Sequence, residues 1–134
     1  MEFIKLVESY EEDIVKSTQE IVRIKSVEEE KKGDMPFGEG PFKALEYALS
    51  LAENMGFKTK NFDNYAAHAD LGDGEETVGI LVHLDVVPEG EDWIYPPYGA
   101  EVHDGKIYGR GTNDDKGPAI ACMYAMKALK ESGV

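Results

Sequence analysis

The segment that decides the fold is Thr77-Val78-Gly79-Ile80-Leu81-Val82-His83-Leu84-Asp85. Its nearly continuous apolar run over residues 77–82 predicts a β-strand that is covered on both faces. Side chains alternate along a strand, so we expect His83 and Asp85 to point the same way. A neutral imidazole is a good zinc ligand, and a nearby carboxylate can fix its tautomer. The alternative for such a short pattern is a buried His–Asp pair with a structural role.

A second candidate site lies in the stretch Gly109-Arg110-Gly111-Thr112-Asn113-Asp114-Asp115-Lys116-Gly117-Pro118. Asn113 or Asp114 could cap the following helix, because the positive end of a helix dipole favours acids. A carboxylate here could instead bridge two cations about 3.5–4 Å apart. The residues alone do not distinguish Asp114 from Asp115. The glycine spacing does not match a phosphate-binding loop, and the late Glu of a calcium loop is missing.

The rest of the chain reads as alternating helical and strand patterns, which is typical of an α/β protein. Helical spacing of apolar residues predicts helices, the first of them one helix or two, over 3–25, 41–52 and 116–132. Short strands, two of them forming a hairpin that turns at Asp104-Gly105, are predicted over 57–62, 65–71 and 100–108. We expect His68 and His103, which lie in these strands, to be solvated rather than to bind metal.

Composition and charge exclude several classes of function. The 134 residues carry a net charge of −13, which disfavours nucleic acid and anionic membrane surfaces as partners. A single cysteine, Cys122, rules out an internal disulfide framework and suits a reducing compartment. The first residues do not resemble a signal peptide, and no apolar run reaches the ~20 residues of a membrane span. We therefore expect a cytoplasmic protein of one domain.

Taken in order, the motifs resemble the superfamily of zinc metallopeptidases that includes carboxypeptidase G, aminoacylase, acetylornithine deacetylase and carnosinase-like dipeptidases. The stretches that carry the resemblance are 83–88, Trp93, 104–111 and 114–118. Two earlier stretches, 24–27 and 36–40, are most similar to PepV-type bacterial dipeptidases. The resemblance implies a zinc-peptidase-like catalytic domain, with a central mixed, largely parallel sheet flanked by helices.

The resemblance also implies a role for three residues. His83 matches a zinc ligand, and Asp85 matches the catalytic residue that orients this site. Asp114 matches the carboxylate that bridges two zinc ions, for which cobalt or manganese are alternatives. We therefore expect the imidazole of His83 and the carboxyl of Asp114 to converge. No separate site for an organic cofactor is expected.

After the motif that contains Asp114, the superfamily pattern continues with a Glu-Glu pair, further metal ligands and a lid or dimerisation domain, none of which follows Pro118 in this sequence. Residues 1–134 are thus expected to be the N-terminal portion of the catalytic domain, an incomplete fold. Without the general-base Glu, a term worth about 10²–10⁴-fold in rate, the chain alone should be inactive.

Three functions are consistent with this sequence. The parent protein is expected to be a zinc-dependent dipeptidase; the alternatives are an N-acyl amino-acid deacylase or desuccinylase, and a non-catalytic binding or assembly domain. The substrate is thus a dipeptide or an N-acyl amino acid. An incomplete sheet would also expose an edge, which favours self-association.

Overall fold

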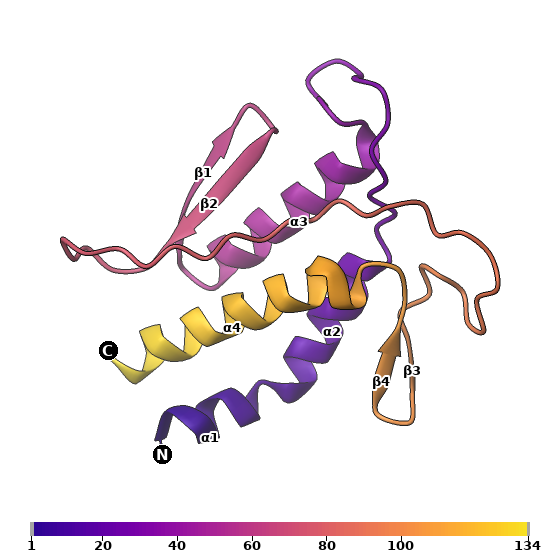
Figure 1. The fold of residues 1–134 in the computed structure, drawn as a ribbon. Helices are drawn as coiled ribbons and strands as arrows, with labels where there is room; N and C mark the ends of the chain where they lie inside the picture. Colours follow the sequence, from indigo (N-terminus) through magenta and orange to yellow (C-terminus); the bar gives the residue numbers. More distant parts are fainter. Residues whose placement is uncertain (1, 134) are drawn as a thin grey trace.

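The computed structural model describes residues 2–133 (Figure 1). Its first helical region is divided into α1 (Glu2–Ser9) and α2 (Glu11–Val22), with Tyr10 between them. The third helix, α3 (Glu39–Asn54), begins after Gly38 and ends just before Gly56, both of which have positive φ angles. The last helix, α4 (Gly117–Ser132), has Pro118 in its first turn and ends at Gly133 in the left-handed conformation. The predicted helices are therefore confirmed, and the first region, predicted over 3–25, forms two helices that end at Val22.

The strands form two separate antiparallel hairpins. The first pairs β1 (Lys58–Phe62) with β2 (Ala66–Asp70), so that Lys60 lies opposite His68. The second pairs β3 (Glu101–His103) with β4 (Lys106–Tyr108) through the predicted turn at Asp104-Gly105, where both residues have positive φ. Asp and Gly tolerate this conformation, which explains the turn.

The core lies where the helices meet. Figure 1 shows α4 running between the α1–α2 pair and α3. Ile21, Ile120 and Tyr124 are buried at this junction, and Tyr10 packs its ring 5.7 Å from that of Tyr124. The Ser17 hydroxyl and the Tyr124 hydroxyl are hydrogen-bonded at 2.9 Å, which satisfies two polar groups inside this core.

The apolar segment 77–82 differs from its prediction. It is extended, but it is not part of any strand ladder among residues 2–133, and Val78 and Leu81 are 92% and 98% exposed. The prediction of a strand covered on both faces is wrong for these residues. Apolar composition indicates where a strand could be buried, but a strand also needs neighbours that pair with it and cover it.

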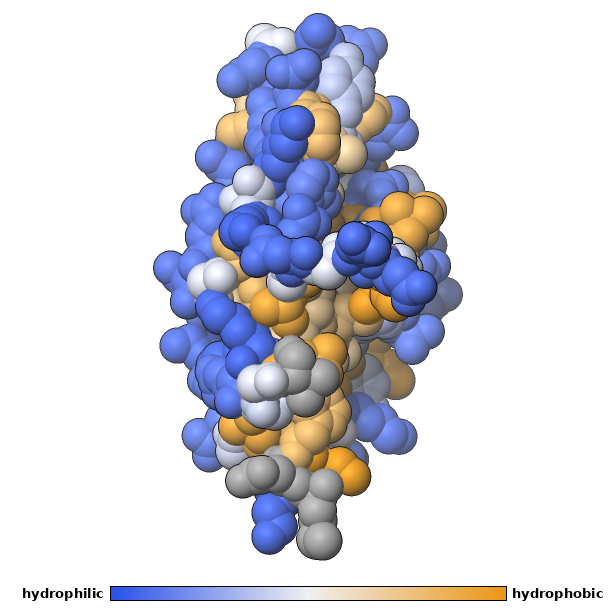
Figure 2. All heavy atoms as spheres, turned by 90° about the vertical axis from the view of Figure 1, so that its left-hand side faces the viewer, coloured by the Kyte–Doolittle hydropathy of each residue, from blue (hydrophilic) through white to orange (hydrophobic). Residues whose placement is uncertain are grey.

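Parallel pairing is limited in the described residues to one bridge between Val27 and Val86. The mixed α/β class is confirmed, with its strands in small sheets rather than in one central sheet across residues 2–133. Figure 2 shows a band of apolar side chains bordered by hydrophilic ones on one face of the molecule. None of the helices in the described part of the chain is long and apolar enough to cross a membrane.

Candidate metal centre

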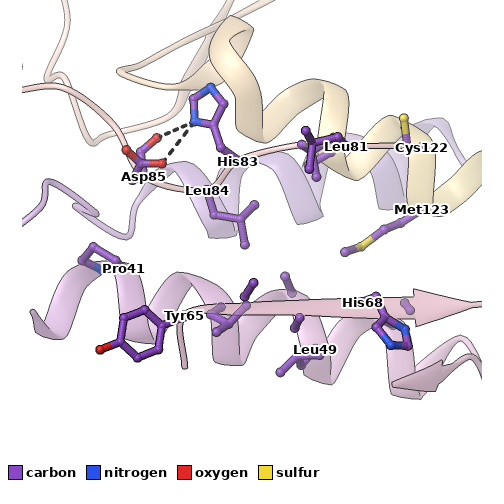
Figure 3. A pocket seen from close by; sticks show the side chains of 18 of the residues that line it. Pro41, Leu49, Tyr65, His68, Leu81, His83, Leu84, Asp85, Cys122 and Met123 are labelled. Carbon is purple, nitrogen blue, oxygen red and sulfur yellow. Dashed lines mark hydrogen bonds and ion pairs between the residues drawn. The ribbon is translucent and has the colours of Figure 1, made fainter. Parts of the chain in front are cut away.

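The extended segment around residue 83 presents its side chains to two sides. Leu84 points into an apolar cavity, and His83 and Asp85, which also line this cavity, lie on the opposite side of the segment from Leu84 and point toward each other (Figure 3). The alternation predicted from the sequence is thus present, although no ladder forms here. The segment is held from behind by Ser26, whose hydroxyl donates to the Leu84 carbonyl at 2.6 Å and whose own carbonyl accepts from the Val86 amide at 3.0 Å.

The turn that carries Asp114, η1 (Thr112–Lys116), contains a kink at Asp114 and Asp115, whose backbone angles are not helical. It begins after Gly111, whose φ is 89°, and the peptide bond between Asp114 and Asp115 is cis. Gly117 follows, at a position where a Cβ atom would lie 2.1 Å from the Thr112 carbonyl oxygen. Only glycine fits so close to the backbone of the turn, which explains its place directly after the acidic pair.

These two segments converge at His83. Its Nε2 lies 2.8 Å from Oδ1 of Asp114, and its Nδ1 lies 3.1 Å from the carbonyl oxygen and 3.3 Å from Oδ1 of Asp85. The His83 amide donates to Oδ2 of Asp115 at 3.3 Å, so the two acids contact different atoms of the same residue. The structure therefore brings together all three residues singled out from the sequence, and it separates Asp114 from Asp115 by position.

Electrostatics at His83 follow from these contacts. The hydrogen bond with Asp114 raises the pKa of His83 above its usual value; burial opposes this rise, and the contacts with Asp85 add to it. Both ring nitrogens face oxygen acceptors, which favours the doubly protonated imidazolium. The side chains of His83 and Asp114 are 49% and 83% exposed, so the pair is open to solvent and to ligands.

Lys116 is a feature that the sequence analysis missed. Its side chain is fully buried, and its ammonium donates to the carbonyl of Ile24 at 2.7 Å. Burial lowers the pKa of Lys116 to about 8, and the charge of Asp85 partly offsets this effect. From the sequence alone, a lysine next to two acids is expected to be exposed to solvent. The contact of Lys116 with Ile24 joins residues far apart in the sequence, so no local pattern predicts it.

The residues present fit part of a metal site. Imidazole nitrogen and carboxylate oxygen are suitable zinc donors, and two donors of one tetrahedral zinc ion lie roughly 3.3–3.6 Å apart at bond lengths of about 2.0–2.2 Å. His83 and Asp114, at 2.8 Å, would need to open only slightly. Within residues 2–133, however, no three His, Cys, Asp or Glu side chains are grouped as a metal site. The chain thus offers two donors, fewer than the three protein ligands of a typical catalytic zinc site.

The other two histidines lie elsewhere. His68 pairs with Asp70 at 3.0 Å on β2 and is 46% exposed, as expected for a surface histidine. His103 is less solvated than expected, because its ring stacks on Tyr95 at 3.8 Å and its Nε2 contacts Glu101 at 2.7 Å. None of these contacts of His68 and His103 involves His83, Asp85, Asp114 or Asp115.

An apolar cavity of about 470 Å³ lies behind the His83 segment. It is bounded by α3, β2, the segment 80–85 and α4, and Leu49, Tyr65, Leu84 and Met123 are among its lining side chains (Figure 3). Because its lining is largely apolar, this space suits packing against further apolar side chains better than it suits binding of a charged substrate.

The loop that follows Asp85 closes on Glu89. The Glu89 carboxylate accepts hydrogen bonds from Lys25 and Tyr98, both at 2.9 Å, and its carbonyl accepts from Trp93 at 2.7 Å and Arg110 at 3.2 Å. These contacts fix the loop against the start of the Asp114 segment. The Arg110 guanidinium also lies over the ring of Trp93, 5.3 Å from its centroid, so these side chains pack against each other.

Comparisons with known proteins agree with the motifs. Residues 79–134 match the family model described as Peptidase family M20/M25/M40. The Beta-Ala-Xaa dipeptidase of Lactobacillus delbrueckii subsp. lactis is 42% identical over 99% of this chain and 29% of its own length. The protein YtjP of Bacillus subtilis is 46% identical over 90% of this chain and 26% of its own length.

A solved structure shows the same fold. The crystal structure of human carnosine dipeptidase 1 superposes with a TM-score of 0.77 at 25% identity, and the match covers 98% of this chain and 31% of that one. The chain spans less than a third of the length of each of these relatives. Residues 79–134 thus match the model of peptidase family M20/M25/M40, and nearly the whole chain is similar to one portion of the dipeptidases named above.

Proposed function

We propose that this chain is the N-terminal portion of the catalytic domain of a zinc-dependent dipeptidase. The observation that carries the proposal is the 2.8 Å approach of His83 and Asp114, which lie 31 residues apart in the sequence. The two residues reach each other from separate motifs, and both acids of the second motif face His83. A purely structural His–Asp pair would not need this degree of exposure to solvent.

The proposed roles follow from the atoms that face one another. His83 Nε2 and the Asp114 carboxylate would hold zinc, and in the complete enzyme Asp114 would contact a second ion. Asp85 would accept a hydrogen bond from Nδ1–H of His83, which keeps the proton on Nδ1 and leaves the Nε2 lone pair for the metal. Zinc, when bound, acts as a Lewis acid that polarises the scissile carbonyl. Cobalt or manganese could replace it with similar donors.

The isolated chain should not hydrolyse peptides. Its described residues provide two metal donors and no group of three, and in this proposal the general-base Glu and the remaining ligands come from further chain of the complete enzyme. The open apolar cavity supports the same proposal, because further chain packed against the 77–85 segment would cover side chains such as Leu81. The missing base alone accounts for about 10²–10⁴-fold in rate.

A dipeptide is the proposed substrate of the complete enzyme. The relatives with stated activities act, by name, on Beta-Ala-Xaa dipeptides and on carnosine. An N-acyl amino-acid deacylase would use the same donors, so the choice depends on the remainder of the enzyme. The single cysteine suits a reducing compartment, and we place the protein in the cytoplasm.

The test compares two proteins and two substrates. The longer protein that contains this segment should hydrolyse a β-alanyl dipeptide faster than an N-acetyl amino acid, should lose activity with a zinc chelator, and should regain it with zinc. The 134-residue chain should be inactive on both. Faster hydrolysis of the N-acyl substrate would establish the deacylase alternative, and chelator-resistant activity would reject the metal site.

Asp114→Asn and Asp115→Asn provide a matched pair in the longer protein. Both changes remove one charge from the same turn, but only Asp114 contacts His83 Nε2, whereas Asp115 contacts the backbone amide. We expect Asp114→Asn to abolish zinc-dependent hydrolysis and Asp115→Asn to retain most of it. An equal loss in both variants would indicate a general charge effect instead.

A further inference from the structure

One short segment, in which Ser26 is buried, lies behind both halves of the candidate metal centre. Residues 24–27 follow α2, and Figure 1 shows the connection from α2 to α3 passing beside the extended 77–86 segment. Ser26, which is fully buried, exchanges hydrogen bonds with the backbone on both sides of Asp85, and Val27 forms a parallel bridge with Val86. The orientation of the His83 segment is thus fixed from residue 26.

The same segment also holds the turn that carries Asp114. Lys116, two residues beyond Asp114, extends its buried side chain to the Ile24 carbonyl at 2.7 Å. The ammonium is directed at a backbone oxygen rather than at a carboxylate, so this contact determines where the turn sits. Without it, a carbonyl and an ammonium would both be buried without partners, which is costly.

The two attachments meet at Gly111. A Cβ atom there would lie 2.6 Å from Cγ1 of Val86 and 3.2 Å from Cδ of Lys116. The Gly111 carbonyl also accepts the Lys116 amide at 3.0 Å. Val86 and Lys116 are therefore packed against the same backbone atom, which leaves little freedom for the two segments to move independently.

We propose that Ser26 and Lys116 are positioning residues that set the separation of His83 and Asp114 through the shared segment 24–27. Neither touches His83 or Asp114 through its side chain; each acts through the backbone that carries them. The relevance of this positioning to metal binding rests on the proposed function, whereas the positioning itself can be measured without metal or substrate.

The chain contains a matched control for each residue. Ser17 is also a buried serine whose hydroxyl is bonded, in this case to Tyr124 in the helical core. Lys130 also donates from its ammonium to backbone carbonyls, those of Met55 and Gly56, both at 2.9 Å. Lys130 lies on α4, the helix that begins directly after Lys116. Its contacts, however, are with the residues that follow α3.

The experiment records the imidazole nitrogen signals of His83 by NMR in the metal-free chain at one pH. The variants are Ser26→Ala and Lys116→Met, with Ser17→Ala and Lys130→Met as controls, and unfolding in urea shows which are folded. We expect both positioning variants to lose the distinct His83 Nε2 signal of the Asp114 contact, and both controls to keep it. The Met variant retains the length of the lysine side chain, so loss of the ammonium is the main change.

A zinc titration of the same samples provides the second readout. Partners that orient a ligand are typically worth 10–100-fold in metal affinity, so Ser26→Ala and Lys116→Met should each weaken zinc binding at His83 by about this factor. If zinc does not bind to the unmodified chain, the metal proposal fails while the positioning result stands on the metal-free spectra.

Three results would overturn the proposal. The first is an unchanged His83 signal in folded Ser26→Ala or Lys116→Met. The second is an equal change in the control variants. The third is global unfolding of both positioning variants while both controls remain folded, because the two contacts would then act as general stability contacts.

Discussion

Gly117→Ala tests how closely the acidic turn is seated against α4. Gly117 has helical dihedral angles, φ −61° and ψ −53°, so alanine is compatible with the backbone there. Helix propensity alone would favour alanine by about 1 kcal/mol. Against this, the new Cβ would lie 2.1 Å from the Thr112 carbonyl oxygen, whereas Cβ atoms essentially never approach within 3.0 Å.

The steric effect should prevail. The obstructing atom is a backbone oxygen, which must retreat by roughly 0.9 Å, and such overpacking typically costs 1–3 kcal/mol. After subtraction of the propensity gain, we expect the unfolding free energy to fall by up to about 2 kcal/mol. Because Thr112 begins the turn that carries Asp114, the 2.8 Å contact with His83 should also be lost.

Urea unfolding measures the first effect, and the His83 imidazole signal measures the second. Gly79→Ala is the control, because a Cβ at Gly79 would meet no heavy atom within 4 Å. This control should be as stable as the unmodified chain or slightly more stable. A Gly117→Ala variant that equals or exceeds the unmodified chain in stability would refute the reasoning, because helix propensity would then have prevailed over the contact.

Three further predictions concern pH, the core and the exposed apolar segment. Hydrogen bonds, first among them that of Lys25, lower the pKa of Glu89 to about 2. The ionised Glu89 carboxylate should therefore stabilise the fold fully above pH 4.5, and this effect should disappear as the pH falls through 2. In urea titrations, the difference in unfolding free energy between the unmodified chain and Glu89→Gln should close over this range. Ile120→Ala should cost about 2–5 kcal/mol in the same assay, because Ile120 is fully buried, whereas the exposed Ile94→Ala should stay within about 0.5 kcal/mol; equal effects would place Ile120 outside the core. Leu81→Lys should reduce any self-association seen by analytical ultracentrifugation without loss of stability, since Leu81 is 98% exposed, and unchanged association would show that another surface is responsible.

The local elements were predictable because their signals are local. Glycines after α3 and α4, the Asp104-Gly105 turn and the helical spacing of apolar residues each specify a feature within a few residues. The extended segment 77–82 was predicted as a buried strand, yet it is exposed. The apolar composition of the segment shows that its side chains could be buried, but the elements that pack against it determine whether they are buried.

The candidate site was predictable only in part from the sequence. The sequence suggested that His83 and Asp85 share a side, and the structure places them in contact. The residues alone could not choose Asp114 over Asp115, since that choice depends on how the turn is oriented toward His83. The buried contacts of Ser26 and Lys116 span 58 and 92 residues, and no local pattern announces contacts at such separations.

The most direct test of the account is an anomalous-scattering map, at the zinc edge, of crystals of the chain grown with zinc. We predict a peak within about 2.0–2.2 Å of both His83 Nε2 and an Asp114 carboxylate oxygen. A map without density between these two atoms, or with zinc bound only at His68 or His103, would contradict the claim that they form one half of a metal centre.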